Sequence, residues 1–445
     1  MAYSLCGLCV SSIASPILHI TSLFLTSPHL TSFHLSMQYQ TETHPSGLRI
    51  ILCREPSAVT YLGLAVRVGT RSEPRRYYGL AHSIEHMLFK GTRLRTAPQI
   101  IQRLEAVGAE MNAYTTKEET ILYVALPRRF AHRALQSLFD IVRGSTFPEE
   151  EWAKEQEVIL DEIHSYEDSP SELIFDEFED QVFRGHPLGH AILGTEGSVG
   201  RIGVEVQRRF FREHYRPERM VLFAQGDLSM EELTALCSHY FPQVATPLRT
   251  PSGQAGGVTV PAPPLRRVRR RDTSQSHVLV GRAAYSAFDP RRLGLSLLTN
   301  ILGGTGMNAR LNMELRERRG LVYNVEASYT PYSDTGLFSV YFGSSPEAEA
   351  EALGLVMQEL ERMRREPLST TELQSALLQL RGQLTIASDN REQAFLSMGK
   401  AFLHHGHYES QQELESRLES LTPEGLHAIA AEVFCPETFH QLIYR

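Results

Sequence analysis

The two halves of the sequence repeat one pattern of residues. Residues 81–92 line up with residues 294–305, which lie 213 positions later, and both segments end in Gly-Thr. A strand-like segment that begins at Asn112 has a counterpart that begins at Asn324, at nearly the same offset. Each half then continues into a long predicted helix behind a proline, namely Pro148 and Pro367. Because the order of these matches agrees, we predict an α+β fold made of two homologous domains. Each domain is expected to be an antiparallel-rich sheet with helices packed on one face.

The length of the chain also argues for two domains. A single hydrophobic core stops growing beyond roughly 250–300 residues, and this chain has 445. The stretch Gln243–Pro264 is rich in Pro, Gly, Thr and Ala and lacks an amphipathic period, so we predict a linker there. The expected domains therefore span residues 37–242 and 265–445.

The first 36 residues differ from everything that follows. They contain no Asp, Glu, Lys or Arg, whereas a secretory signal has a basic start and a mitochondrial presequence has arginines. Polar residues and prolines interrupt the apolar runs, so no membrane span is expected. We expect Met37 to be the true start and residues 1–36 to be an uncharged extension that is not native.

Charge and cysteine content exclude some classes of protein. Lys and Arg number 44 against 52 Asp and Glu, a formal net charge of −8, which offers no footprint for nucleic acid. The five cysteines form no dense disulfide framework and favour a reducing compartment. A cytoplasmic location is expected, or a secreted or periplasmic one if residues 1–36 act as a signal.

The strongest chemical signal is the segment His82-Ser-Ile-Glu-His86 in the first copy. At 100° per residue, His82, Glu85 and His86 fall within an arc of about 100° on one helix face. Two histidines one turn apart can share a zinc ion, and Glu85 can take a proton from a zinc-activated water. The order His-x-x-Glu-His inverts the common zinc motif. At the aligned positions the second copy has Leu and Thr, so we assign the chemistry to the first copy, with one Zn²⁺ per chain.

A hydrolytic zinc site needs a third protein ligand. The helix behind Pro148 carries Glu155 and Glu162 seven residues apart, and therefore on nearly the same face. The apolar run 158–160 between them indicates that part of this helix is buried, where a carboxylate needs a partner. We predict that Glu162 is the third ligand. Glu155 is predicted to support the site without touching the metal, by contacting the ligands.

Two other groups of residues carry weaker signals. His404, His405 and His407 have no ordered spacing and no acidic neighbour, so we interpret them as surface residues. The segment Gly303-Gly-Thr-Gly306 lacks the Gly-Lys-Ser/Thr ending of a phosphate-binding loop, which makes nucleotide binding unlikely as a function.

Taken together, these residues resemble the M16 metallopeptidases, the family of pitrilysin, insulysin and mitochondrial processing peptidase, and specifically its small two-domain members. The resemblance covers residues 37–445 and includes the spacing of 76 residues between His86 and Glu162. Ser83 departs from the family, which usually has bulky residues between the histidines. Further family-like blocks are Gly108–Thr115, His186–Thr195, Tyr215–Met220 and Arg316–Tyr323.

The resemblance implies that the chain forms half of a clamshell. The chamber would be closed by dimerisation, either with a second copy or with an M16-like subunit. Inside it, the zinc site would meet the family's Arg/Tyr pair, matched here by Arg316 and Tyr323, which would hold the substrate or the oxyanion. The substrate main chain would add to a strand edge near Asn112 and Ala113.

The function that the resemblance implies is a zinc-dependent endopeptidase or oligopeptidase acting on unfolded or short peptides, with Glu85 as general base. The alternative is a non-catalytic M16-like subunit that binds or structures a partner. Such subunits generally lack the complete set of His82, Glu85, His86 and Glu162, which this chain has.

Overall fold

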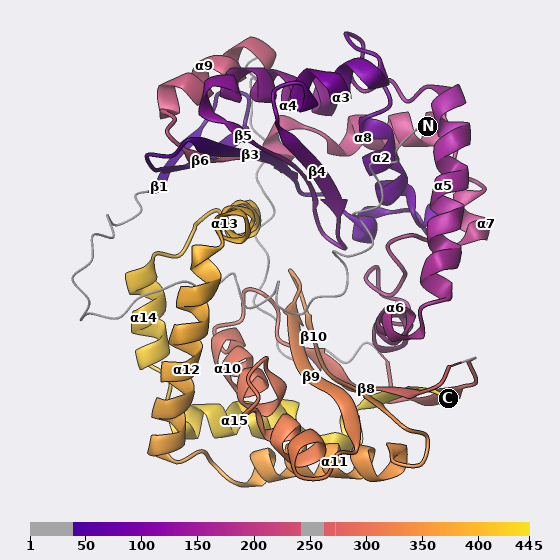
Figure 1. The fold of residues 1–445 in the computed structure, drawn as a ribbon, viewed down its shortest axis with the longest axis vertical. Coiled ribbons are helices and arrows are strands. Elements are labelled where there is room, and N and C mark those ends of the chain that lie inside the picture. Colours follow the sequence, from indigo (N-terminus) through magenta and orange to yellow (C-terminus); the bar gives the residue numbers. More distant parts are fainter. Residues whose placement is uncertain (1–38, 242–261, 272) are drawn as a thin grey trace.

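The computed structural model describes residues 39–241, 262–271 and 273–445. The predicted start at Met37 and most of the predicted linker at 243–264 lie outside the described residues. Figure 1 shows the two halves of the chain one above the other, each built on its own sheet. Helix labels follow that figure.

The first half contains a six-stranded sheet in the order β1-β2-β6-β3-β5-β4. Its neighbours are antiparallel except for β2 and β6. The strands are β1 Tyr39–Thr43, β2 Arg49–Arg54, β3 Val59–Val66, β4 Glu110–Thr115, β5 Thr120–Pro127 and β6 Met220–Gly226. The helices are α2 Leu80–Leu88, α3 Ala97–Glu105, α4 Ala131–Gly144, α5 Glu149–Glu167, α6 Pro170–Val182, α7 Glu196–Val199, α8 Val204–His214 and α9 Met230–Tyr240.

The second half contains a five-stranded sheet in the order β7-β11-β8-β10-β9. Its strands are β7 Arg266–Arg269, β8 Ser276–Ala284, β9 Val322–Pro331, β10 Gly336–Ser344 and β11 His440–Tyr444. The helices are α10 Arg292–Gly303, η7 Asn312–Glu317, α11 Glu349–Arg365, α12 Thr370–Asp389, α13 Arg391–His405, α14 Gln411–Glu419 and α15 Pro423–Val433.

The internal repeat seen in the sequence is a repeat of topology. The order β2-β6-β3-β5-β4 in the first sheet corresponds strand by strand to β7-β11-β8-β10-β9 in the second. In both sheets the first two of these strands are parallel and the remaining pairs are antiparallel. Helix α2 lies between β3 and β4 in the chain, and α10 lies between β8 and β9. The predicted α+β fold with two homologous halves is confirmed.

Each half has its own core between its sheet and the helices on one face. In the first half this core joins residues of β3 and β5 to α2 and α4. In the second half it joins β8 and β10 to α10, α11 and α15. The central strands are buried on both faces, as the wholly buried run of β6 illustrates. A second layer must therefore cover the face that these helices leave open.

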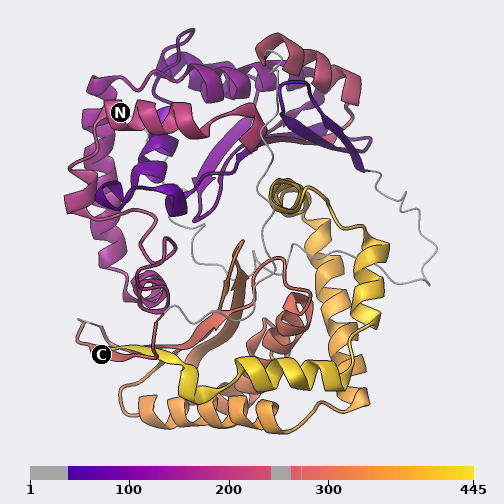
Figure 2. The same ribbon diagram turned by 180° about the vertical axis from the view of Figure 1, so that it is seen from behind.

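That second layer comes from the opposite half of the chain. Helix α13 of the second half packs on β3 and β6 of the first sheet through Phe395, Leu396 and Leu403. Helix α6 of the first half packs on β8 and β11 of the second sheet through Phe178 and Val182. Figures 1 and 2 show α13 beneath the upper sheet and α6 beside the lower one. The two halves thus exchange one helix each, which joins them into one body.

The close packing of α13 on the first sheet requires a residue without a side chain at position 399. The Phe223 ring of β6 stacks on Phe395 with 4.4 Å between ring centroids. A Cβ at Gly399 would lie 2.5 Å from the same Phe223 ring. We expect Gly399→Ala to lower the free energy of unfolding by about 1–3 kcal/mol through overpacking, measured by chemical denaturation.

A matched control for this substitution is Gly382→Ala on α12. A Cβ at Gly382 meets no atom within 4 Å, so the higher helix propensity of alanine should leave stability unchanged or raise it by up to ~1 kcal/mol. Equal free energies of unfolding for the two variants would contradict the close packing of α13 against Phe223.

Two further observations concern the chain as a whole. Among the described residues, no helix is both long enough and apolar enough to cross a membrane. The described cysteines Cys53, Cys237 and Cys435 are free thiols.

Candidate metal centre

Helix α2 carries the first part of the predicted site on a buried face. His82, Glu85 and His86 are all buried. The helix begins behind Gly79, whose φ of 91° is in the left-handed region. A Cβ at Gly79 would also approach the Leu193 carbonyl oxygen to 2.5 Å. Glycine at this position therefore allows α2 to start where it does.

The side chains of His82, His86 and Glu162 converge on one point. The two Nε2 atoms of His82 and His86 are 3.3 Å apart. The Oε2 atom of Glu162 lies 3.7 Å from His82 Nε2 and 3.5 Å from His86 Nε2. Tetrahedral zinc with bonds near 2.0–2.1 Å holds its ligand atoms about 3.4 Å apart. The spacing of these three atoms therefore fits a zinc ion.

Helix α5 contributes Glu155 and Glu162, which lie at different distances from the two histidine Nε2 atoms. Glu162 faces the two histidine Nε2 atoms, whereas Glu155 lies one layer behind them. The Glu155 Oε2 atom is 3.0 Å from His86 Nδ1, and its Oε1 atom is 2.5 Å from Lys90 Nζ. A carboxylate on the far nitrogen of a metal-binding histidine fixes its tautomer and ring orientation. The structure thus brings together all four residues that the sequence assigned to the metal and its support.

The electrostatics of the site call for a cation. Burial, reinforced by the neighbouring His86, lowers the pKa of His82 to about 3, which keeps its ring neutral as a metal ligand requires. Burial acts in the same direction on His86, but its hydrogen bonds with Glu155 and Glu162 outweigh burial and raise its pKa to about 10. The carboxylates thus favour a positive charge between them, and a divalent cation supplies it.

The general base predicted from the motif lies at the wall of a large cavity. Glu85 and His82 line a cavity of about 1060 Å³ between the two halves, together with Asn112 and Ala113. The latter two residues belong to β4, which ends the first sheet and is therefore an edge strand. An edge of this kind can accept an added strand. The structure places the predicted base and the predicted substrate edge in the same cavity.

Arg316 and Tyr323 lie elsewhere. Arg316 is in η7 and Tyr323 is in β9, with 66% of the tyrosine exposed. The Arg316 side chain is half exposed and its guanidinium lies 4.0 Å from Glu317. Neither residue lines the cavity that contains His82 and Glu85. Within one chain, therefore, the structure does not bring this pair to the metal centre.

Ser83, the departure from the family pattern, forms a hydrogen bond with a neighbouring helix. Its hydroxyl is buried, donates to the Leu80 carbonyl and accepts from Gln207 Nε2 at 3.1 Å. Gln207 belongs to α8, so Ser83 ties α2 to a neighbouring helix on the side away from the metal ligands. The small polar residue is thus accommodated by a hydrogen bond between α2 and α8.

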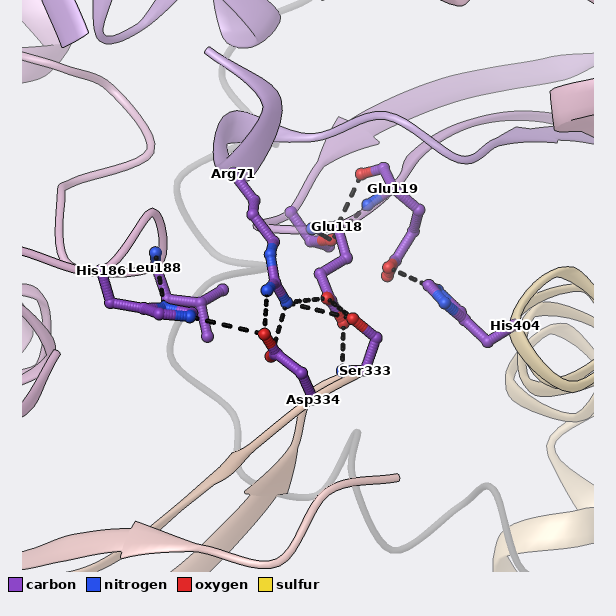
Figure 3. Close-up of polar contacts among 9 residues, drawn as sticks. Arg71, Glu118, Glu119, His186, Leu188, Ser333, Asp334 and His404 are labelled. Atoms are coloured by element: carbon purple, nitrogen blue, oxygen red, sulfur yellow. Dashed lines mark hydrogen bonds and ion pairs between the residues drawn. The ribbon is translucent and has the colours of Figure 1, made fainter. Parts of the chain in front are cut away.

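The structure corrects the interpretation of His404. Instead of lying free on the surface, it is partly buried, with Nε2 2.9 Å from Glu119 Oε2 (Figure 3). Its acidic neighbour is 285 residues away in the sequence, so no local pattern could indicate it. His405 and His407 are exposed, as expected.

A second contact between the halves was not predicted from the sequence. Figure 3 shows Arg71 between Glu118 of the first half and the β9–β10 turn of the second. The Arg71 Nη1 atom donates to Glu118 Oε1 at 2.7 Å and to Asp334 Oδ1 at 2.8 Å. The Ser333 amide donates to Glu118 Oε2 at 2.9 Å. These contacts hold the turn against the first half, and Glu118 and Ser333 line the cavity.

Comparisons with known proteins agree with the fold and show the family. A family described as "Insulinase (Peptidase family M16)" matches residues 49–196, and one described as "Peptidase M16 inactive domain" matches residues 201–380. The chain is 34% identical over 398 residues to an uncharacterized zinc protease of Streptomyces coelicolor, covering 88% of this chain and 86% of that protein. It is 28% identical over 394 residues to an uncharacterized zinc protease of Bacillus subtilis, covering 88% and 95%.

Solved structures share the fold. A protease from Helicobacter pylori superposes with a TM-score of 0.82 at 17% identity, covering 92% of this chain and all of that one. A peptidase M16 inactive domain from Pseudomonas fluorescens superposes with a TM-score of 0.81 at 21% identity, covering 92% and 97%. The matched sequences and the repeated two-sheet fold confirm the resemblance noted in the sequence, and the chain belongs to the insulinase family, peptidase family M16.

Proposed function

We propose that this protein is a zinc-dependent endopeptidase or oligopeptidase that hydrolyses unfolded or short peptides. The observation that carries the proposal is the convergence of His82, His86 and Glu162 beside Glu85, at the wall of a cavity that is large enough for a peptide segment. The names of the relatives, which are zinc proteases, support the same reaction class.

In this proposal His82, His86 and Glu162 hold one zinc ion per chain, and Glu155 orients His86 from behind. When bound, zinc supplies a Lewis acid that polarises the scissile carbonyl and lowers the pKa of water. Three protein ligands would leave a further position for water on the metal, as a catalytic site requires.

Glu85 performs the proton transfers. It lies one turn from His82 on the same helix face and lines the cavity with it. Its carboxylate takes a proton from the attacking water and then returns that proton to the leaving amine. Because the side chain is buried, bulk water does not compete for its hydrogen bonds.

The edge of β4 supports a preference for extended peptides. A substrate strand added beside Asn112 and Ala113 would be held by main-chain hydrogen bonds, which are tolerant of sequence. Such a strand lies in the cavity between the two halves. A folded protein has few unpaired strands to offer, so unfolded segments and short peptides are the fitting substrates.

The positions of Arg316 and Tyr323 favour a working dimer. Since neither residue lines the cavity of its own chain, we propose that a partner chain supplies this pair to the metal centre. A second copy or an M16-like subunit could do so. The pair would then hold the substrate or the developing oxyanion.

Mixing two impaired chains tests the dimer. We expect little activity from Glu85→Gln alone, or from a chain with Arg316→Ala and Tyr323→Phe. When equal amounts of the two chains exchange subunits at random, half of the dimers are mixed, and each mixed dimer has one intact site out of two. About a quarter of the wild-type activity should therefore return. A wild-type chain that is fully active as a monomer, measured by analytical ultracentrifugation at assay concentration, would contradict this arrangement.

The reaction class is tested on the purified protein with a quenched library of unstructured peptides. We expect about one zinc per chain by metal analysis, and hydrolysis that stops on chelation and returns with Zn²⁺. A metal-free, inert protein would instead favour the non-catalytic subunit, which the complete ligand set argues against.

A further inference from the structure

Glu73 is a buried carboxylate that lies at the start of the helix carrying the metal ligands. Its side chain has no exposed surface. The Glu73 Oε2 atom accepts from the Gly79 amide at 2.9 Å, and Oε1 accepts from the Ala81 amide at 2.6 Å. The His190 Nε2 atom lies 3.2 Å from Oε2. Both oxygens of Glu73 are therefore engaged by groups that hold the first turn of α2.

This capping arrangement differs from that of the other helices. Ser229, Ser369 and Ser410 cap α9, α12 and α14 with a hydroxyl group from the residue that precedes each helix. Helix α2 follows a glycine, so it has no such side chain, and Glu73 reaches its amides from six residues upstream. Burying a carboxylate is costlier than placing a hydroxyl there, since burial raises the pKa of Glu73 to about 8.

The two histidine ligands differ in how they are held. His86 is oriented directly, because Glu155 contacts its Nδ1 atom. The Nδ1 atom of His82 is buried and has no hydrogen-bond partner among the described residues. The orientation of the His82 ring therefore depends on the backbone of the first turn of α2, and the amide of Ala81, the residue before it, is bound by Glu73.

Glu73 is linked through His190 to residues that line the cavity. The His190 ring stacks on Tyr78 with 3.6 Å between centroids, and its carbonyl accepts from Lys117 Nζ. Lys117 Nζ lies 3.0 Å from Glu179 on α6, which accepts from the Tyr332 hydroxyl of the second half at 2.6 Å. The cap of α2 is thus part of a buried network that reaches both halves of the chain.

We propose that Glu73 is a positioning residue of the metal centre. It fixes the first turn of α2, and thereby places His82 for the metal, as Glu155 does for His86 by direct contact. This inference rests on the proposed function, because it assumes that His82 binds zinc.

The test is Glu73→Gln, which keeps the shape of the side chain but replaces one accepting oxygen by an NH₂ group. At least one of the amides of Gly79 and Ala81 or the ring of His190 then loses its acceptor. We expect zinc affinity, measured by competition with a chelator, to fall about 10-fold, as is typical when the support of a metal ligand is removed. The visible absorption spectrum of the Co²⁺-substituted protein should change as well.

A matched control is Ser369→Ala, which removes the cap of α12, where Ser369 Oγ accepts from the Glu372 amide at 3.2 Å. It should lower the melting temperature while leaving zinc affinity and the Co²⁺ spectrum unchanged. If Glu73→Gln does not fold, Glu73→Asp keeps the carboxyl group on a shorter side chain, and a smaller loss of zinc affinity is expected.

The outcomes separate this inference from the proposed function. A folded Glu73 variant with wild-type zinc affinity and a wild-type Co²⁺ spectrum would overturn the positioning role, whatever its melting temperature. A wild-type protein that binds no zinc would instead overturn the proposed function, and the positioning role with it.

Discussion

Replacing Glu85 with Gln is expected to lower kcat for peptide hydrolysis by about 10²–10⁴-fold, the usual contribution of a general base. The amide has the shape of the carboxylate but cannot accept the proton of the attacking water. The proposed metal ligands His82, His86 and Glu162 are untouched, so the variant should still bind about one zinc per chain. Turnover of a quenched peptide and metal analysis on the same preparation measure both effects.

Glu326→Gln is the control for this experiment. Glu326 lines the same cavity from β9 in the second half, and it is not a member of the metal cluster. Most of the activity should remain in this variant. A Glu85→Gln protein that is as active as the wild type would show that Glu85 is not the base, even if zinc is present.

Removal of a metal ligand should have a different signature, in which zinc and activity disappear together. Apparent zinc binding free energies of ~10–16 kcal/mol, shared over four ligands, amount to about 2.5–4 kcal/mol each, or roughly 10²–10³-fold in affinity. We therefore expect His82→Ala to lose zinc during chelator competition at concentrations that leave the wild type loaded. Activity should follow the zinc content of each sample.

His404→Ala is the matched control for ligand removal. His404 lines the same cavity, but it contacts Glu119 and belongs to no metal cluster. Its replacement should leave zinc content at the wild-type level. Full zinc occupancy in His82→Ala under the same competition would exclude His82 as a ligand.

The local parts of the site follow from the sequence because helix geometry is local. Residues at positions i, i+3 and i+4 of a helix share a face whatever surrounds them, which places His82, Glu85 and His86 together. The same reasoning puts Glu155 and Glu162 on one side of α5. Pro148 and the three glutamates behind it likewise predict where α5 begins.

Contacts between distant segments could not be predicted in this way. The acceptor of His404 is on the other half of the chain, and the carboxylate that caps α2 comes from upstream of an intervening turn. Glu73 does stand six residues before the glycine of α2, but its role depends on a chain path that no periodicity describes. The exchange of α6 and α13 between the halves is of the same kind.

The sequence by itself determined the α+β repeat, the face of α2 that carries His82, Glu85 and His86, and the shared face of the two glutamates of α5, because these depend on order and on helical periodicity. Only the tertiary structure decided that α2 and α5 pack so closely that three ligand atoms come within 4.8 Å of one another. It also decided that Arg316 and Tyr323 lie away from this point within one chain. The physical reason is that distances across a fold depend on how buried faces pack, and the spacing of residues along the chain does not determine that packing.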